Sequence, residues 1–147
     1  MQSNFEKTID TRTIKTDRTT FLKVLLVDDD KIMHEMLELA LETSEYSLVS
    51  AMNAKQGMEM IASSFPPDIV ITDALMPGDS GFSLITAIKS NPKTADIPVI
   101  LWTVLEQPNG TVMDSSGKAD FSLSKPFNLG KLLDCLTKAR QLIKASF

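Results

Sequence analysis

Runs of apolar, largely β-branched residues alternate along the chain with segments whose apolar residues recur at helical spacing. The apolar runs lie near 23–28, 47–51, 68–73, 97–103 and 120–124, and they predict five β-strands. Amphipathic helices are predicted near 30–44, 54–64, 81–90 and from about 129 onward, with a weaker fifth helix near 110–116. This alternation indicates an α/β fold, a doubly wound five-stranded parallel sheet flanked by five helices.

The helical spacing also predicts which side chains face the sheet. In the first helix the predicted apolar face consists of Met33, Met36, Leu37 and Ala40. His34, the only histidine of the chain, is expected at an exposed position on that helix. In the last helix the predicted face consists of Leu129, Leu132, Leu133, Leu136 and Ile143. Cys135 and Leu142 flank this face and are the candidates for a homodimer interface.

Length, charge and cysteine content narrow the class of protein. The 147 residues suffice for one domain, predicted over 22–147, and the polar, threonine-rich stretch 1–21 is predicted to be a flexible tail. A net charge of −4 argues against direct nucleic-acid binding. The chain has neither a membrane-length apolar run nor a signal-peptide core, so we expect a cytoplasmic protein without membrane contact. One cysteine excludes an internal disulfide and a multi-cysteine zinc site.

Aspartates lie at or directly after the ends of two predicted strands. Asp28, Asp29 and Asp30 come after the first strand, and Asp73 ends the third. In open parallel sheets the carboxyl ends of the strands share one edge, where ligands bind. Several carboxylates at one edge repel each other unless a hard divalent cation neutralises them, and Mg²⁺ favours carboxylates together with phosphate oxygens and water. The pattern therefore predicts a Mg²⁺-dependent site that handles phosphoryl groups.

Four motifs, each closing a predicted strand, together resemble the receiver domain of two-component response regulators. They are Val27-Asp28-Asp29-Asp30, Thr72-Asp73 with the loop as far as Gly81, Trp102-Thr103, and Ser124-Lys125-Pro126-Phe127. Their order and separations match that family from about Leu22 to the C-terminus. The resemblance implies a flavodoxin-like sheet with strand order 2-1-3-4-5.

The resemblance also implies a role for each residue of the site. Asp73 matches the phosphoacceptor, and Thr103 and Lys125 match the hydroxyl and ammonium groups that bind the phosphoryl oxygens. The implied Mg²⁺ ligands are Asp29 directly, Asp28 through water, Asp73, and the backbone carbonyl of Leu75. The bond between Lys125 and Pro126 is cis in the family. Asp30 is expected to have a structural role, as the N-cap of the first helix.

By the same resemblance, the expected function is signalling. A sensor histidine kinase or a phosphotransfer protein would phosphorylate Asp73, and the altered surface would be recognised by a downstream protein. Such a domain is not an enzyme in the usual sense, because it catalyses only its own phosphorylation and a slow autodephosphorylation. No output domain is predicted after the last helix, so the expectation is a single-domain regulator or a piece of a longer protein.

The chain departs from the family pattern at two positions. Ser122 stands where the family commonly has an aromatic switch residue, and the nearest aromatic, Phe121, is one step away and so on the other face of the strand. Val104 replaces the usual small residue after Thr103 and is expected to narrow the access to Asp73. These departures put the usual output coupling in question.

Two other functions remain open from the sequence alone. A phosphotransferase of the haloacid-dehalogenase type would use Asp28 as the nucleophile with Asp30 two residues later, but Ile32 occupies the place where that motif has Thr or Ser. A receiver-like interaction module that is never phosphorylated is disfavoured because all five functional side chains are present. Substituting Asp28 or Asp73 separates these hypotheses.

Overall fold

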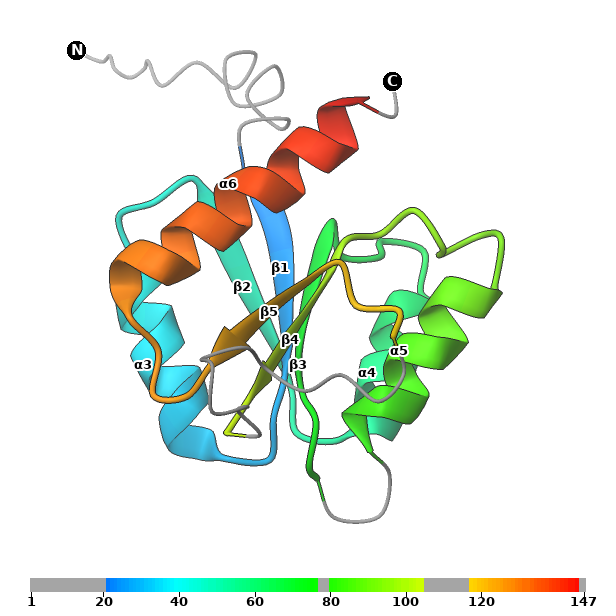
Figure 1. The fold of residues 1–147 in the computed structure, drawn as a ribbon, viewed down its shortest axis with the longest axis horizontal. Helices are drawn as coiled ribbons and strands as arrows, with labels where there is room; N and C mark the ends of the chain where they lie inside the picture. Colours follow the sequence, from blue (N-terminus) through cyan, green and yellow to red (C-terminus); the bar gives the residue numbers. More distant parts are fainter. Residues whose placement is uncertain (1–20, 77–79, 105–116, 146–147) are drawn as a thin grey trace, which may run out of the picture.

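The computed structural model describes residues 21–76, 80–104 and 117–145, and these form one sheet with helices on both faces (Figure 1). In chain order the elements are β1 (Leu22–Val27), α3 (Lys31–Leu41), β2 (Tyr46–Ala51), α4 (Ala54–Ile61), β3 (Ile69–Asp73), α5 (Gly81–Ser90), β4 (Val99–Thr103), β5 (Phe121–Ser124) and α6 (Leu129–Ala145). No helix within these residues is long and apolar enough to cross a membrane.

All strand pairs are parallel, and the order β2-β1-β3-β4-β5 confirms the predicted topology. Four helices lie in the described residues. The fifth predicted helix, near 110–116, falls outside them, as does the predicted tail except for Phe21. The three central strands are buried on both faces, which explains why their sequences are continuous apolar runs without alternation.

The core consists of two layers, one on each face of the sheet, because successive strand residues point to opposite sides. Under α3 and α6 the buried cluster includes Leu26, Ile71 and Trp102, which pack with residues of both helices. Under α4 and α5 it includes Val27 and Leu101 together with residues of those helices. Trp102 is among the largest of these residues, and its side chain has no exposed surface.

Side-chain caps fix where three of the helices begin. Asp30 caps α3 by accepting a hydrogen bond from the backbone N–H of Ile32 at 2.9 Å, as predicted. Asn53 caps α4 and Ser80 caps α5 in the same way. The helices α3 and α4 are each three residues shorter at their C-terminal ends than predicted from the apolar pattern, because that pattern does not mark where the last backbone bonds form.

The predicted faces of α3 and α6 were partly wrong. On α3, Met36 is exposed, while His34 and Leu41 are buried beside Leu37. On α6, Leu129 and Leu133 are exposed, and the buried residues are Leu132, Leu136 and Ala139. In both helices the buried stripe is rotated about the helix axis relative to the prediction. The side on which a helix meets the sheet decides the stripe, and hydrophobicity alone does not locate it when apolar residues occupy both sides.

Candidate functional site

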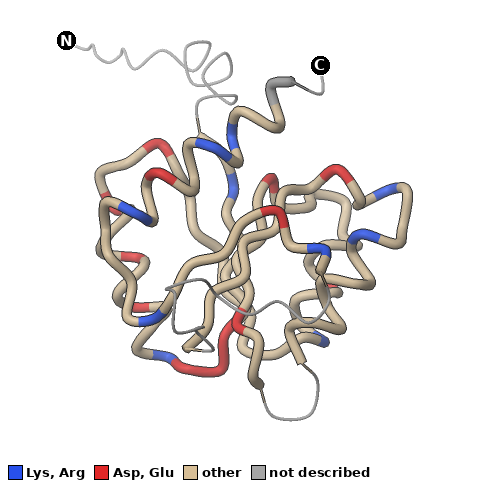
Figure 2. Tube along the Cα trace, in the orientation of Figure 1, with Lys and Arg blue, Asp and Glu red and all other residues tan. Residues whose placement is uncertain are grey.

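The strand register gathers the predicted site residues at one edge of the sheet. Val27 pairs with Thr72, Asp73 with Trp102, and Thr103 with Ser124, so the residues at or just beyond these strand ends are neighbours. Figure 2 shows the three aspartates after β1 as one acidic stretch leading into α3. The carboxyl ends of β1, β3, β4 and β5 thus bring the four motifs of the sequence together.

Three carboxylates form the acidic centre of this edge. One oxygen each of Asp28, Asp29 and Asp73 lies within 4.8 Å of the other two. Asp28 and Asp73 are buried, whereas Asp29 is exposed and leaves the cluster open to solvent. Oxygen ligands of this charge and spacing suit a hard divalent cation, and the cluster therefore fits the predicted Mg²⁺. Leu75, whose carbonyl is the fourth predicted ligand, lies two residues beyond Asp73.

Lys125 neutralises part of the acidic charge. Its Nζ lies 2.7 Å from Oδ2 of Asp28 and 3.1 Å from Oδ2 of Asp73. The loop that holds it begins where the backbone N–H of Lys125 donates to the carbonyl of Thr103 at 3.1 Å, and the Lys125–Pro126 bond is cis, as predicted. Burial would lower the pKa of Lys125, but the paired carboxylates outweigh it and raise that pKa above its ordinary value. The ammonium group therefore stays charged.

At Asp73 burial outweighs the contacts that favour the charged form, unlike at Lys125. Its side chain is largely buried, and this burial raises its pKa above the ordinary value, with a further contribution from the like charge of Asp28. Hydrogen bonds from Lys125 and from the backbone N–H of Leu75, the latter at 3.3 Å, act in the other direction without cancelling the rise. Relative to a free aspartate, the ionised form of Asp73 is thus less favourable in the folded chain.

A glycine allows α5 to begin directly against the end of β3. A Cβ atom at Gly81 would lie 1.8 Å from the carbonyl oxygen of Asp73, a distance that no side chain can accept. The backbone N–H of Gly81 instead donates to the carbonyl of Ala74 at 3.0 Å. The first turn of α5 is therefore packed against the backbone of Asp73. The sequence placed Gly81 within the motif, but only the structure gives the reason for it.

His34 is the residue whose role the sequence did not predict. The expectation of an exposed position was wrong, because His34 is only 7% exposed. Its Nε2 lies 2.7 Å from the backbone carbonyl oxygen of Asp28, and its Nδ1 lies 2.9 Å from Oγ of Ser50. The available signal was its helical spacing to Leu37 and Leu41, which places all three on one face of α3.

The departures from the family pattern have distinct structural settings. Phe121 packs against the core beneath α3 and α6, whereas Ser122 is exposed, so the aromatic ring does not occupy the position of Ser122. Thr103 is fully buried, and Val104 beside it is 64% exposed. The expectation that Val104 narrows access to Asp73 stays a prediction.

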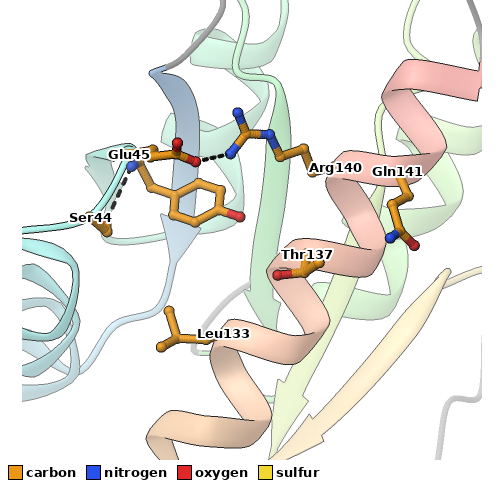
Figure 3. A pocket seen from close by; sticks show the side chains of 7 residues that line it. Ser44, Glu45, Leu133, Thr137, Arg140 and Gln141 are labelled. Carbon is orange, nitrogen blue, oxygen red and sulfur yellow. Dashed lines mark hydrogen bonds and ion pairs between the residues drawn. The ribbon is translucent and has the colours of Figure 1, made fainter.

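A separate groove lies at the opposite end of the strands. It has a volume of about 610 Å³ and is lined by residues from the start of β2 and from α6, among them Glu45, Thr137 and Arg140 (Figure 3). Arg140 pairs there with Glu45 across the groove. None of the residues lining this groove belongs to the acidic cluster.

Sequence comparison shows which proteins share these features. The profile of the response regulator receiver domain matches residues 24–137. The chain is 29% identical to the DNA-binding dual master transcriptional regulator RpaA of Synechocystis, over 76% of this chain and 46% of that protein. It is 32% identical to the phosphate regulon transcriptional regulatory protein PhoB of Pseudomonas aeruginosa, over 75% of this chain and 48% of the relative. The chain thus spans about half the length of these relatives.

Solved structures give the same result. A putative response regulator of Chloroflexus aurantiacus has a TM-score of 0.74 at 28% identity, covering 82% of this chain and 98% of that one. The response regulator TrrA of Thermotoga maritima, solved in complex with Mg²⁺ and BeF, has a TM-score of 0.69 at 30% identity, covering 80% of this chain and 98% of that one. With its acidic edge, its sheet order and these relatives, the chain belongs to the response regulator receiver domain family of two-component systems.

Proposed function

We propose that Asp73 accepts a phosphoryl group from a sensor histidine kinase or a phosphotransfer protein, in the presence of Mg²⁺ held by Asp28, Asp29, Asp73 and the carbonyl of Leu75. One observation carries this proposal: Asp73 lies at the centre of the acidic edge, with a carboxylate cluster on one side and the ammonium group of Lys125 in contact with it. Phosphorylation then changes the surface that a downstream protein recognises.

The residues around Asp73 support each requirement of the transfer. A carboxylate oxygen of Asp73 forms the new bond to phosphorus, while the bond to the donor breaks and its electron pair leaves with the donor. Lys125 is already within 3.1 Å of Asp73 and can donate to an oxygen of the incoming group. Thr103 ends the neighbouring strand and offers a hydroxyl. When bound, Mg²⁺ supplies the positive charge that allows an anionic nucleophile to approach an anionic donor.

The dehalogenase-like alternative has less support from the same contacts. Asp28 is completely buried, its Oδ1 accepts a hydrogen bond from the backbone N–H of Asp30 at 2.9 Å, and its Oδ2 pairs with Lys125. The nucleophile that this alternative requires is therefore closed off from solvent and from a donor. Asp73 is the aspartate with greater access to solvent of the two.

Intact-mass measurement tests the proposal. Acetyl phosphate with Mg²⁺ is expected to add one phosphoryl group to the wild-type chain and none to Asp73→Asn. The matched control is Asp96→Asn, which changes an exposed aspartate outside the cluster and is expected to be labelled normally. Labelling that persists in Asp73→Asn and disappears in Asp28→Asn would overturn the proposal in favour of the dehalogenase-like mechanism.

The apolar surface beside the site suggests where a protein donor makes contact. Ile32, Met36 and Leu39 form an exposed apolar stripe along α3, which begins directly after the acidic stretch, and Leu39 is 72% exposed. Leu129, at the start of α6 and just after the Lys125 loop, is exposed as well. We propose that the phosphoryl donor protein packs on this stripe, since apolar contact beside the reacting carboxylate would orient it.

Comparison of a protein donor with a small donor tests this surface. Leu39→Glu is expected to slow transfer from a phosphorylated histidine kinase about tenfold, equivalent to about 1.4 kcal/mol, while labelling by acetyl phosphate stays unchanged. The control is Phe65→Glu, which places the same charge on a side chain that is 77% exposed and lies between α4 and β3. Equal rates for both variants with the kinase would exclude α3 as the contact surface.

A further inference from the structure

His34 connects three elements at the acidic edge. It lies on α3, its Nε2 is 2.7 Å from the carbonyl oxygen of Asp28 at the end of β1, and its Nδ1 is 2.9 Å from Oγ of Ser50 on β2. A carbonyl oxygen only accepts hydrogen bonds, so Nε2 carries the proton in the contact with Asp28. The imidazole is buried, which strengthens the contact and makes its loss costly.

The carbonyl oxygen that His34 contacts belongs to Asp28, the residue that directly follows β1. The paired residues of β1 end at Val27, which lies opposite Ala51 and Thr72, and the backbone N–H of Asp28 still donates to the carbonyl of Ala51 at 3.1 Å. The carbonyl of Asp28 belongs to the next peptide, which leads to Asp29. Rotation of that peptide would move the Asp29 carboxylate relative to those of Asp28 and Asp73.

We propose that His34 is a positioning residue for the metal site: by holding the Asp28 carbonyl, it fixes the peptide that aims Asp29 at the cation. This inference rests on the proposed function, because it assumes that the three carboxylates bind Mg²⁺. Residues that orient metal ligands without touching the metal change metal affinity when they are replaced. His34 does not contact the cation or the phosphoryl group, and its effect passes through the backbone of Asp28.

A buried histidine can also serve stability alone, and the two hydrogen bonds of His34 allow the roles to be separated. The bond to Ser50 joins α3 to β2, a strand that carries none of the three carboxylates, whereas the bond to Asp28 acts at the backbone of one of them. Ser50→Ala removes only the first. His34→Leu removes both and keeps an apolar side chain of similar volume. His34→Gln retains an amide donor near the position of Nε2, and His34→Asn retains a group only near the position of Nδ1.

Calorimetric titration with Mg²⁺, combined with urea unfolding in EDTA, tests the proposal. His34→Leu is expected to bind Mg²⁺ about tenfold more weakly than the wild type. Ser50→Ala is expected to stay within about twofold of the wild type, and His34→Gln to recover most of the loss that His34→Asn shows. In labelling by acetyl phosphate, His34→Leu should need more Mg²⁺ for half-maximal rate but should approach the wild-type rate at saturation. A solely structural role would lower the urea midpoint without this split.

Two results would overturn the inference: Mg²⁺ affinity in His34→Leu equal to the wild type, or an equal loss in Ser50→Ala. If His34→Leu does not fold, the comparison of His34→Gln with His34→Asn decides, and equal Mg²⁺ affinities for that pair would overturn it. Failure of the proposed function has a different signature, because the wild-type chain itself would then show no Mg²⁺ binding and no labelling. Normal wild-type binding and labelling beside unaffected His34 variants would reject only the role of His34.

Discussion

Among single residues, Asp73 combines its proposed role as phosphoacceptor with a destabilising position. Its carboxylate is buried beside Asp28, and its pKa is raised mainly because burial disfavours the charged form. Lys125 compensates only in part. Residues of this kind are maintained for their chemistry although they weaken the fold, and neutral replacements often make the protein more stable.

Asp73→Asn is therefore expected to raise the free energy of unfolding by about 1 kcal/mol at neutral pH without Mg²⁺. Because the pKa of Asp73 is raised in the folded chain, its stabilising protonated form is fully present at low pH and is lost as the pH rises through that pKa. The advantage of Asn should shrink toward acidic pH. Urea unfolding at several pH values measures this, with Asp96→Asn as control. A less stable Asp73→Asn at neutral pH would mean that pairing with Lys125 outweighs burial.

Leu75 permits a prediction about the lifetime of the phosphorylated state. Its side chain is exposed next to Asp73 and cannot hydrogen-bond an attacking water. Leu75→Asn supplies such a group and is expected to accelerate autodephosphorylation about tenfold, or about 1.4 kcal/mol of barrier. The release of phosphate after removal of the donor gives the rate. The control Leu142→Asn, on the exposed side of α6, should leave the rate of autodephosphorylation unchanged. An unchanged rate in Leu75→Asn would mean that hydrogen bonding to the attacking water does not limit hydrolysis.

The sequence was informative for site residues that follow strands. Asp28, Asp73, Thr103 and Lys125 each close or follow a strand, and the ends of parallel strands must meet at one edge. His34 escaped prediction because its neighbours on α3 include apolar residues on both sides of the helix. The carbonyl that it binds belongs to the backbone, which leaves no trace in the residue types.

At the level of elements, the close contact between α5 and β3 makes Gly81 sensitive. Gly81→Ala would bring Cβ against the Asp73 carbonyl, and because the obstacle is backbone, β3 or α5 must shift. We expect a loss of about 2–3 kcal/mol of stability, measured by urea unfolding. Gly130→Ala is the control, since its Cβ would meet only the end of the Asn128 side chain. A Gly81→Ala chain of wild-type stability would contradict the contact.

For the helices, the sequence predicted the starts better than the buried faces. The caps Asp30 and Ser80 lie at the starts of α3 and α5, where cap residue types mark the first turn. The buried faces of α3 and α6 were less predictable, because Met36 and Leu133 are apolar yet exposed. The apolar pattern identifies a helix, but contact with the sheet selects its inner side when apolar residues exceed what one face can hold.

For the whole molecule, both buried clusters of the described residues begin in β1. Among those residues the earliest cluster member is Val24, with Leu22 packed beside it, and the family profile matches 24–137. We expect removal of residues 1–20 to change the free energy of unfolding by no more than about 0.5 kcal/mol, as measured by urea unfolding. Removal of 1–25 deletes most of a central strand and should prevent folding. A large loss from the shorter deletion would assign residues 1–20 a structural role.

The pairing of Lys125 with two of the three clustered carboxylates has a consequence for signal strength. When all four groups are ionised, they leave two negative charges at the edge of the sheet. A divalent cation cancels these. Phosphorylation replaces the single negative charge of the Asp73 carboxylate by about two on the acyl phosphate, which makes the edge negative again. The cation and the phosphoryl group therefore favour each other's presence. Thermodynamic reciprocity requires the two effects to be equal, so under the proposed function we expect the fraction of chains phosphorylated at equilibrium to depend on the concentration of free Mg²⁺.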